Sequence, residues 1–212
     1  MPDRNRFSVN LFGGKTVDRR KEILDAATNS FTSFGYKATT VEQVAKIANV
    51  GKGTIYTFFK NKEELFEAVV RTLIQEMKEE TDKIIEPTAS FMHNAHLALM
   101  KLLQFRERHL LFAKMLEEEK VIRTPVVKVM LLKIEDEIIS FISKRLTIAI
   151  EKGEIGPCDT EHVSYLLFKS YFAFIVDWQI THEESLNGHR LVYRIKDDIV
   201  EVLVLSAYGH YK

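Results

Sequence analysis

The chain has 212 residues, of which 46% are hydrophobic and 28% are charged, with 30 Lys and Arg balanced by 30 Asp and Glu. This length holds one larger domain or two smaller ones with a real core. The single Cys158 excludes an intramolecular disulfide, and the longest apolar stretch, Tyr171 to Val176, is too short to span a bilayer. With no apolar run after the first basic residues, we expect no signal peptide, no membrane partner and a cytoplasmic location.

Charge is distributed unevenly along the chain. Residues 1–62 carry 11 Lys and Arg against 5 Asp and Glu, whereas residues 63–212 carry 19 against 25. A basic N-terminal third beside an acidic remainder is typical of a DNA-reading head on a regulatory body.

The N-terminal region begins with a predicted flexible arm, residues 1–16, which contains Gly13 and Gly14 between apolar fragments. A helix is expected from Val17 to about Phe34, because Ile23, Ala27, Phe31 and Phe34 are spaced along one face. Gly35 is expected to end this helix as a C-cap.

Residues 39–62 predict two short helices joined by a tight turn. Thr40 precedes an apolar run and is followed by Gln43 at the capping-box spacing, so it is the expected N-cap of the first helix. Asn49 stands where the chain must reverse, and Asn tolerates the left-handed conformation. The expected inner face consists of Val44, Ala45 and Ile47.

The second short helix has two contrasting sides. Gly51 and Gly53 bracket its start, and the side with Ile55 and Phe59 is expected to be buried. The other side offers one lysine, two hydroxyls and a tyrosine, which suit phosphates and base edges. Two interpretations of Phe58 stay open, namely contact with a thymine methyl and core packing. The expected DNA contacts are Thr40, Lys52, Gly53, Thr54, Tyr56, Thr57, Phe58 and Lys62.

This region resembles the helix-turn-helix of TetR-family transcriptional regulators. The most telling part is the run from Gly53 to Leu65, Gly-Thr-Ile-Tyr-Thr-Phe-Phe-Lys-Asn-Lys-Glu-Glu-Leu, and the resemblance covers roughly residues 17–70. The family usually has glycine where Asn49 stands and often serine where Gly51 stands, and both changes are compatible with the fold. By this resemblance Lys62, at the start of the next helix, contacts the DNA backbone.

The rest of the chain is expected to be helical throughout. Asn61 should cap a connecting helix, residues 63–86, that buries Leu65, Phe66, Val69, Leu73 and Met77. Pro87 marks the break before the body, residues 87–212. Its expected helices are 91–105, 110–116, one opened by Thr124 and Pro125 and ending near Gly153, one from Asp159 to about Thr181, and one from Asn187 or Gly188 to about Ala207.

The last two predicted helices are apolar on more than one face, over Phe168 to Trp178 and Ile199 to Leu205. Such helices need cover from several sides, which implies a partner subunit rather than burial within one monomer. In TetR-like proteins the last two helices pair with their counterparts as a four-helix bundle. We therefore expect a homodimer that binds a palindromic operator.

The body also has the composition of a ligand pocket. Aromatic side chains and methionines are concentrated in segments expected to surround its centre, although plain core packing explains the same pattern. The predicted ligand-binding residues are His96, Phe112, Met115, Phe141, Tyr165, Phe168, Tyr171, Phe172 and Trp178.

Other chemistry has little support in the sequence. No phosphate loop, nucleophile–base spacing or glycosidase-like carboxylate pair stands out, so no catalytic residues and no cofactor are expected. His93 and His96 are three residues apart, but no cysteine or carboxylate shares their stripe, so no metal site is expected. The sequence predicts an all-α protein with a three-helix helix-turn-helix domain, residues 17–62, and a helical ligand-binding and dimerisation domain. Its expected function is repression relieved by a small apolar or aromatic ligand, the alternative being a DNA-organising protein without a ligand.

Overall fold

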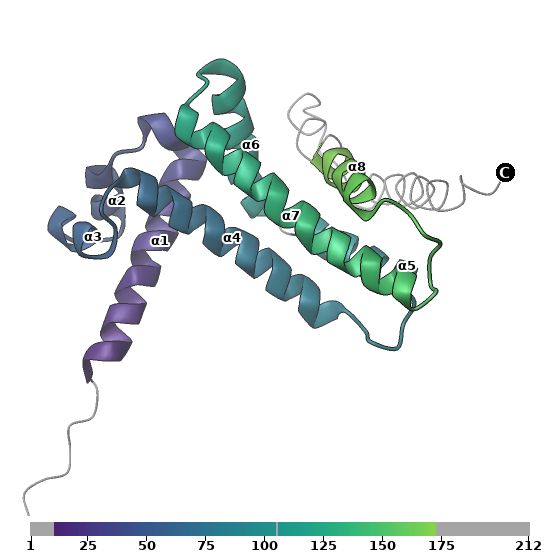
Figure 1. Cartoon of the computed structure of the whole chain (residues 1–212). Coiled ribbons are helices and arrows are strands. Elements are labelled where there is room, and N and C mark those ends of the chain that lie inside the picture. Colours follow the sequence, from purple (N-terminus) through teal and green to yellow (C-terminus); the bar gives the residue numbers. More distant parts are fainter. Residues whose placement is uncertain (1–10, 105, 173–212) are drawn as a thin grey trace, which may run out of the picture. The chain divides into compact units, whose positions relative to one another are not determined.

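The computed structural model describes residues 11–104 and 106–172, which form helices and their connections (Figure 1). No strand occurs within these ranges, so the all-α prediction is confirmed. The predicted last helix, Phe105, Trp178 and the side chains of Tyr171 and Phe172 lie outside what the structure describes. The helices are α1 (Leu11–Ala38), α2 (Val41–Ile47), α3 (Lys52–Phe58), α4 (Lys62–Ile84), α5 (Phe91–Gln104), α6 (Arg106–Val121), α7 (Pro125–Glu151) and α8 (Thr160–Phe172).

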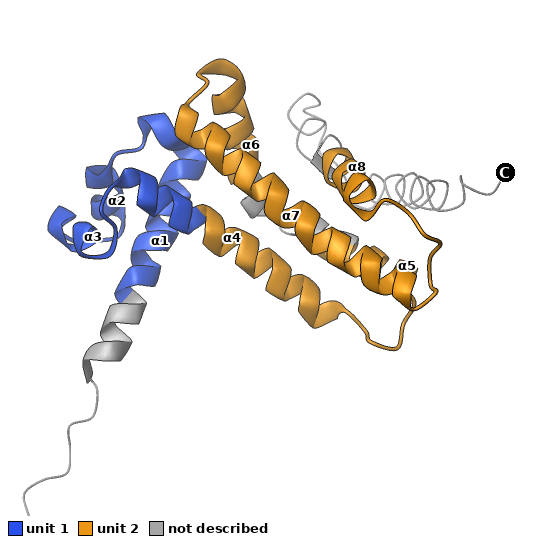
Figure 2. Cartoon of the chain, in the orientation of Figure 1, with its two compact units in different colours: residues 1–69 blue, residues 70–212 orange. Residues whose placement is uncertain are grey.

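The chain divides into two compact units, residues 1–69 and residues 70–212 (Figure 2). Helix α4 begins in the first unit, called the head below, and continues into the second, called the body. In the described part of the chain, no helix combines the length and apolar character needed to cross a membrane.

The core of the head is built from one face of each of its helices. Phe31 of α1 and Phe66 of α4 are fully buried, and their rings meet edge to face with centroids 4.8 Å apart. The predicted inward residues that are buried in this core are Ile23, Ala27, Phe31, Val44, Ala45, Ile55, Phe59, Leu65, Phe66 and Val69.

Two predicted core residues of the head are exposed instead. Phe34 is 51% exposed, because α1 breaks at Gly35 (φ 79°, ψ 171°) and Tyr36 takes the core position, with its ring 4.9 Å from that of Phe66. Ile47 is 48% exposed because it is the last residue of the two-turn helix α2, where the chain turns away. In the head, helical periodicity therefore mispredicted burial only near the ends of α1 and α2.

Two predicted caps and the predicted turn of the head are confirmed, whereas the first helix begins at Leu11 rather than at the predicted Val17 and extends past Gly35 to Ala38. The backbone N–H of Gln43 donates to the Thr40 hydroxyl at 3.2 Å, and Asn49 adopts the left-handed conformation with φ 52°. The Asn61 side chain accepts from the N–H of Glu64 at 2.8 Å, and the Glu64 carboxylate accepts from the N–H of Lys60 at 2.7 Å. These reciprocal bonds fix the start of α4 directly after α3.

The body is organised around the long helix α7. Helix α4 runs beside it in the same direction, as the ion pairs Lys78–Glu137 and Asp82–Arg145 show together, and α8 returns antiparallel along it (Figure 1). Helix α7 ends at Glu151, and the φ of 71° at Gly153 allows the amides of residues 153 and 154 to bond back to the last turn. Asp159 accepts from the backbone N–H of His162 at 3.0 Å, which confirms it as the cap of α8.

Two details of the body differ from the sequence prediction. Thr124 is the N-cap residue of α7, but its hydroxyl donates to the buried Glu118 carboxylate at 2.7 Å and makes no cap hydrogen bond. Helix α6 is longer than the predicted 110–116 segment, because charged residues continue it on both sides of the apolar stretch. An apolar stripe marks only the covered part of a helix.

Candidate nucleic-acid interface and body cavity

Helix α3 presents a polar side and buries an apolar one. Lys52, Tyr56 and Thr57 are exposed, whereas Ile55 and Phe59 are 1% and 2% exposed. Since α2 and α3 are each seven residues long, their inner faces have few residues and the apolar contacts of Ile55 and Phe59 set the orientation of α3. The arrangement leaves a row of donors on one surface of the head.

Lys52, the cation on the polar side of α3, is already paired within the head. The Lys52 ammonium donates to the Glu42 carboxylate of α2 and lies 5.8 Å from the centre of the Tyr56 ring. The hydrogen bond from Lys52 holds the pKa of Glu42 below its ordinary value, and the same contact raises the pKa of Lys52. Any phosphate that binds Lys52 must therefore compete with Glu42.

The other expected DNA contacts take different positions. Thr40 is exposed at the start of α2, and Gly53 is exposed with open space where a side chain would stand. Thr54 is half-buried, and its carbonyl accepts from the Thr57 hydroxyl at 2.7 Å. Phe58 is also half-buried, which leaves both of its sequence-based readings open.

Lys62 is held by the head itself. Its ammonium donates to the carbonyl oxygens of Tyr36 at 2.9 Å and Thr39 at 3.0 Å, and lies 4.4 Å from the centre of the Tyr36 ring. A third carbonyl, that of Lys37, is 3.5 Å away. Lys62 thus stabilises the end of α1, and its expected phosphate contact remains a prediction. Spacing gave no signal for this role, since the three carbonyls lie more than twenty residues earlier in the chain.

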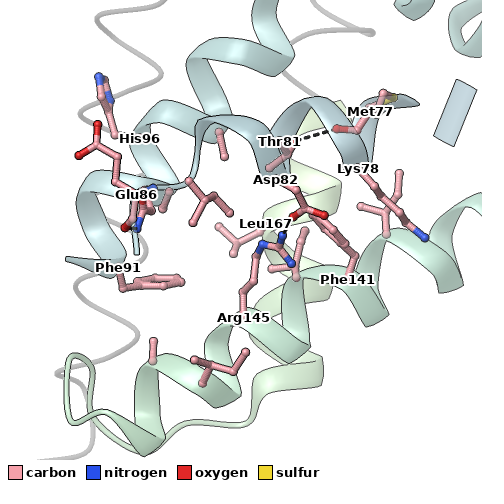
Figure 3. Close-up of a pocket in the computed structure, with 18 of the residues that line it drawn as sticks. Met77, Lys78, Thr81, Asp82, Glu86, Phe91, His96, Phe141, Arg145 and Leu167 are labelled. Carbon is pink, nitrogen blue, oxygen red and sulfur yellow. Dashed lines mark hydrogen bonds and ion pairs between the residues drawn. The ribbon is translucent and has the colours of Figure 1, made fainter. Parts of the chain in front are cut away.

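The body contains a cavity of about 460 Å³ lined by residues of α4, α5, α6, α7 and α8 (Figure 3). A volume in this range fits a small organic ligand. Most of the lining is apolar and includes Ile74, Met77, Ile85, Phe91, Phe112, Ile138, Phe141, Ile142, Leu167 and Phe168.

A few polar groups interrupt this apolar lining. Arg145 of α7 donates to the Asp82 carboxylate of α4, and the centre of its guanidinium lies 3.8 Å from the centre of the Phe141 ring. Two buried nitrogens have no hydrogen-bond partner in the described part of the chain, Nε of Arg145 and Nδ1 of His96. Buried polar atoms without partners are uncommon, and a ligand is one way to satisfy them.

The structure brings together only part of the predicted ligand-binding set. His96, Phe112, Phe141 and Phe168 line the cavity. Met115 is buried but is not among the lining residues, and Tyr165 is 41% exposed, with its ring beside Lys169. Tyr171, Phe172 and Trp178 are the predicted residues whose side chains are outside the described range.

Sequence reasoning missed Glu42 in the head and Asp82 and Arg145 in the body. The pairs they form join residues 10 and 63 positions apart, so no local pattern announces them. Lys78 and Asp82 stand one turn apart on α4, but Asp82 is exposed, and an exposed charge gives no signal of a partner on another element.

Comparison with known proteins identifies the family. The profile described as "Bacterial regulatory proteins, tetR family" matches residues 23–69. The HTH-type transcriptional regulator YhgD of Bacillus subtilis (strain 168) is 46% identical over 185 residues, which cover 85% of this chain and 97% of that protein. The chain belongs to the TetR family. It is accordingly a transcriptional regulator, and the family is one of regulators rather than enzymes.

Solved structures of other TetR-like regulators share the fold. GusR of Salmonella enterica superposes with a TM-score of 0.74 at 22% identity, over 92% of this chain and 99% of that one. The regulator FadR of Bacillus subtilis, solved in complex with stearoyl-CoA, gives a TM-score of 0.70 at 22% identity, over 90% and 99% of the two chains. The TM-scores show a common fold, and at identities this low they show the fold alone.

Proposed function

We propose that this TetR-family regulator is a homodimeric repressor that leaves its operator when a small, largely apolar ligand occupies the body. The observation that carries this proposal is the cavity of about 460 Å³, with its mostly apolar lining and a few polar groups. The FadR structure was solved with stearoyl-CoA, so a TetR-like fold can bind a ligand with a long apolar part.

The head supplies the DNA-binding surface of the proposal. Tyr56 and Lys62 are assigned to phosphates, whereas Lys52, Thr54 and Thr57 are assigned to the region nearest the bases. Thr40, Gly53 and Phe58 complete the surface. Two such heads related by a two-fold axis require a palindromic site with half-sites about one helical turn or more apart.

The dimer is assigned to the last two helices predicted from the sequence, on the basis of their apolar faces. A charge in the last of them, as in Val202→Lys, should dissociate the dimer. Sedimentation at micromolar concentration measures this directly. A native chain that is monomeric and still binds a palindromic site tightly would exclude the dimer.

Helix α4 provides the physical connection for release. It contributes Leu65 and Phe66 to the core of the head, and Ile74, Met77 and Asp82 to the cavity lining of the body. A ligand that changes the position of α4 can therefore change the geometry of the head. A near-complete switch requires the ligand to favour the non-binding state by about 5 kcal/mol.

The test begins with selection of the operator from random duplex DNA by the purified protein. Apolar and aromatic compounds are then screened twice, for thermal stabilisation of the free protein and for release of the bound operator. Compounds that do both support ligand-controlled repression. Stabilising compounds that never affect operator binding would favour the second candidate, a DNA-organising protein of the same fold.

A further inference from the structure

The guanidinium of Arg145 lines the body cavity beside Asp82 (Figure 3). It stacks on Phe141, at 3.8 Å between centres, and its side chain is only 30% exposed. Two other cations of the described lining also have partners. Lys78 holds Glu137 at 2.8 Å, and Lys152 is 3.9 Å from Glu154.

Arg145 uses only part of its binding capacity. Its Nη2 donates to one oxygen of Asp82, while its Nε is buried and finds no acceptor among the described residues. Nε and Nη2 form one edge of the guanidinium, and their two parallel N–H groups match the two oxygens of a carboxylate. Asp82 therefore engages one of the two nitrogens of an edge that a carboxylate can fill completely.

Asp82 is an easily displaced partner. Its side chain is 58% exposed, so it can return to water at little cost when another anion takes its place. The guanidinium keeps one carboxylate partner in such an exchange, since one carboxylate replaces another. A neutral ligand cannot replace Asp82 in this way, because it offers the guanidinium no carboxylate.

From this geometry we infer that the cavity binds a monocarboxylic acid with an apolar body. Its carboxylate takes the Nε and Nη2 edge of Arg145 in place of Asp82, and its apolar part lies against Phe141 and the neighbouring lining. This inference rests on the proposed function and names the ligand class for the same site. Since Asp82 belongs to α4 and Arg145 to α7, ligand binding breaks a link between these helices. Loss of that link is the step that frees α4 to change the head.

The first test compares acids with their methyl esters in calorimetric titrations of the full-length protein. The probes are decanoate, a branched aliphatic acid and phenylpropionate, each paired with its ester. We expect acids to bind about tenfold to a hundredfold more tightly than the esters, the effect of hydrogen bonds to a charged group. Arg145→Gln should remove this preference, and Arg145→Lys, which keeps the charge without the planar edge, should keep part of it. Equal binding of acid and ester, or no binding by any acid, would overturn the inference.

The second test removes the competitor. Asp82→Asn should tighten acid binding about threefold, in line with loss of an exposed ion pair, and should leave ester binding unchanged. Glu137→Gln is the matched control, because it removes a carboxylate from the neighbouring Lys78 pair and leaves the Arg145 edge intact. Weaker acid binding in Asp82→Asn would contradict the exchange. If Arg145→Gln fails to fold, acid binding by Asp82→Asn still tests the proposed exchange.

The two proposals fail in different ways. Acids that bind through Arg145 without affecting operator binding would support this site and overturn ligand-controlled repression. Neutral apolar compounds that release the operator, in a protein that binds no acid, would overturn this site and support the repressor.

Discussion

Two phenylalanines show how differently the head and the body are packed. Phe66 of the head is fully buried, with ring centroids 4.8 Å from Phe31 and 4.9 Å from Tyr36. Phe141 of the body is half-buried, borders the cavity and has the Arg145 guanidinium over its ring. Around Phe66 the core of the head is filled by aromatic rings, and the candidate DNA contacts lie on the surface. Around Phe141 the body leaves a cavity, and the candidate ligand contacts line it.

Polar groups follow the same division. In the head, the buried hydroxyls of Ser30 and Thr39 lie 3.3 Å apart, and Thr39 donates to the Gly35 carbonyl at 2.7 Å. In the body, the buried Nε of Arg145 and Nδ1 of His96 have no partner within the described ranges. An interior in which the polar groups are hydrogen-bonded holds one conformation. A polar group without a partner can instead be satisfied by a ligand.

The largest expected effect compares these two interiors directly. Phe66→Ala should lower the free energy of unfolding by about 3–5 kcal/mol, because it leaves a cavity in a filled core. Phe141→Ala should cost about 1 kcal/mol, because its ring already borders empty space and less apolar contact is lost. Hydrogen exchange of α1 amides reports the first loss, and exchange of α7 amides reports the second.

Equal losses at the two positions would contradict the difference in packing. Ile55→Val in the head is a useful intermediate, since it removes one methylene from a side chain that is 1% exposed. Its expected cost is about 1 kcal/mol.

Sequence patterns predicted the structural features that depend on residues close together in the chain. Thr40, Asn49 and Asn61 were identified as caps or turn residues because capping uses residues within one turn. The inward faces of α1 and α4 followed from helical periodicity, and failed at Phe34, where Gly35 breaks the helix. Residues close together in the sequence therefore predict caps, turns and inward faces up to the point where a helix ends.

The functional details depend on contacts between distant segments. Lys52 was predicted to face outward, but its pairing with Glu42 depends on the angle between α2 and α3. Tyr165 was placed in the pocket because aromatic residues cluster around it, yet it is exposed on α8. The composition of a helix shows that apolar faces exist, and only packing shows which of them enclose a cavity.

The second prediction concerns the surface of the head. Lys52→Ala should weaken operator binding by about 1–3 kcal/mol and reduce discrimination against altered operators, if Lys52 lies near the bases. Lys144→Ala is the charge-matched control, because Lys144 is exposed on α7 of the body. Fluorescence anisotropy with the operator and with single-base variants measures both effects. Equal weakening by the control would show that only net charge matters.

The third prediction separates two roles of Lys62. Lys62→Ala should destabilise the head by about 1 kcal/mol, since the carbonyls of Tyr36 and Thr39 lose a charged donor. A phosphate contact adds a second effect, a salt dependence of operator binding that is flatter by about one unit. Lys144→Ala again controls for charge. An unchanged salt slope would restrict Lys62 to the support of α1.

The smallest expected effect tests whether Glu42 restrains the DNA-binding surface. Glu42→Gln frees the Lys52 ammonium, so operator affinity should rise by a factor of up to about five, as expected for the loss of an exposed ion pair. The slope of log affinity against log salt concentration should become steeper by at most about 0.9, because one negative charge leaves the interface. Glu22→Gln is the matched control, since it breaks the exposed Arg19–Glu22 pair of the same unit without touching Lys52.

The pH of this last experiment matters. Because Lys52 holds the pKa of Glu42 below its ordinary value, the pair is intact at neutral pH and weakens only as the pH falls through that lowered pKa. The advantage of Glu42→Gln over the native chain should therefore be full at neutral pH and shrink on acidification, when Glu42 itself becomes protonated. Lower affinity of Glu42→Gln at neutral pH would mean that Glu42 instead holds Lys52 in the orientation that DNA requires.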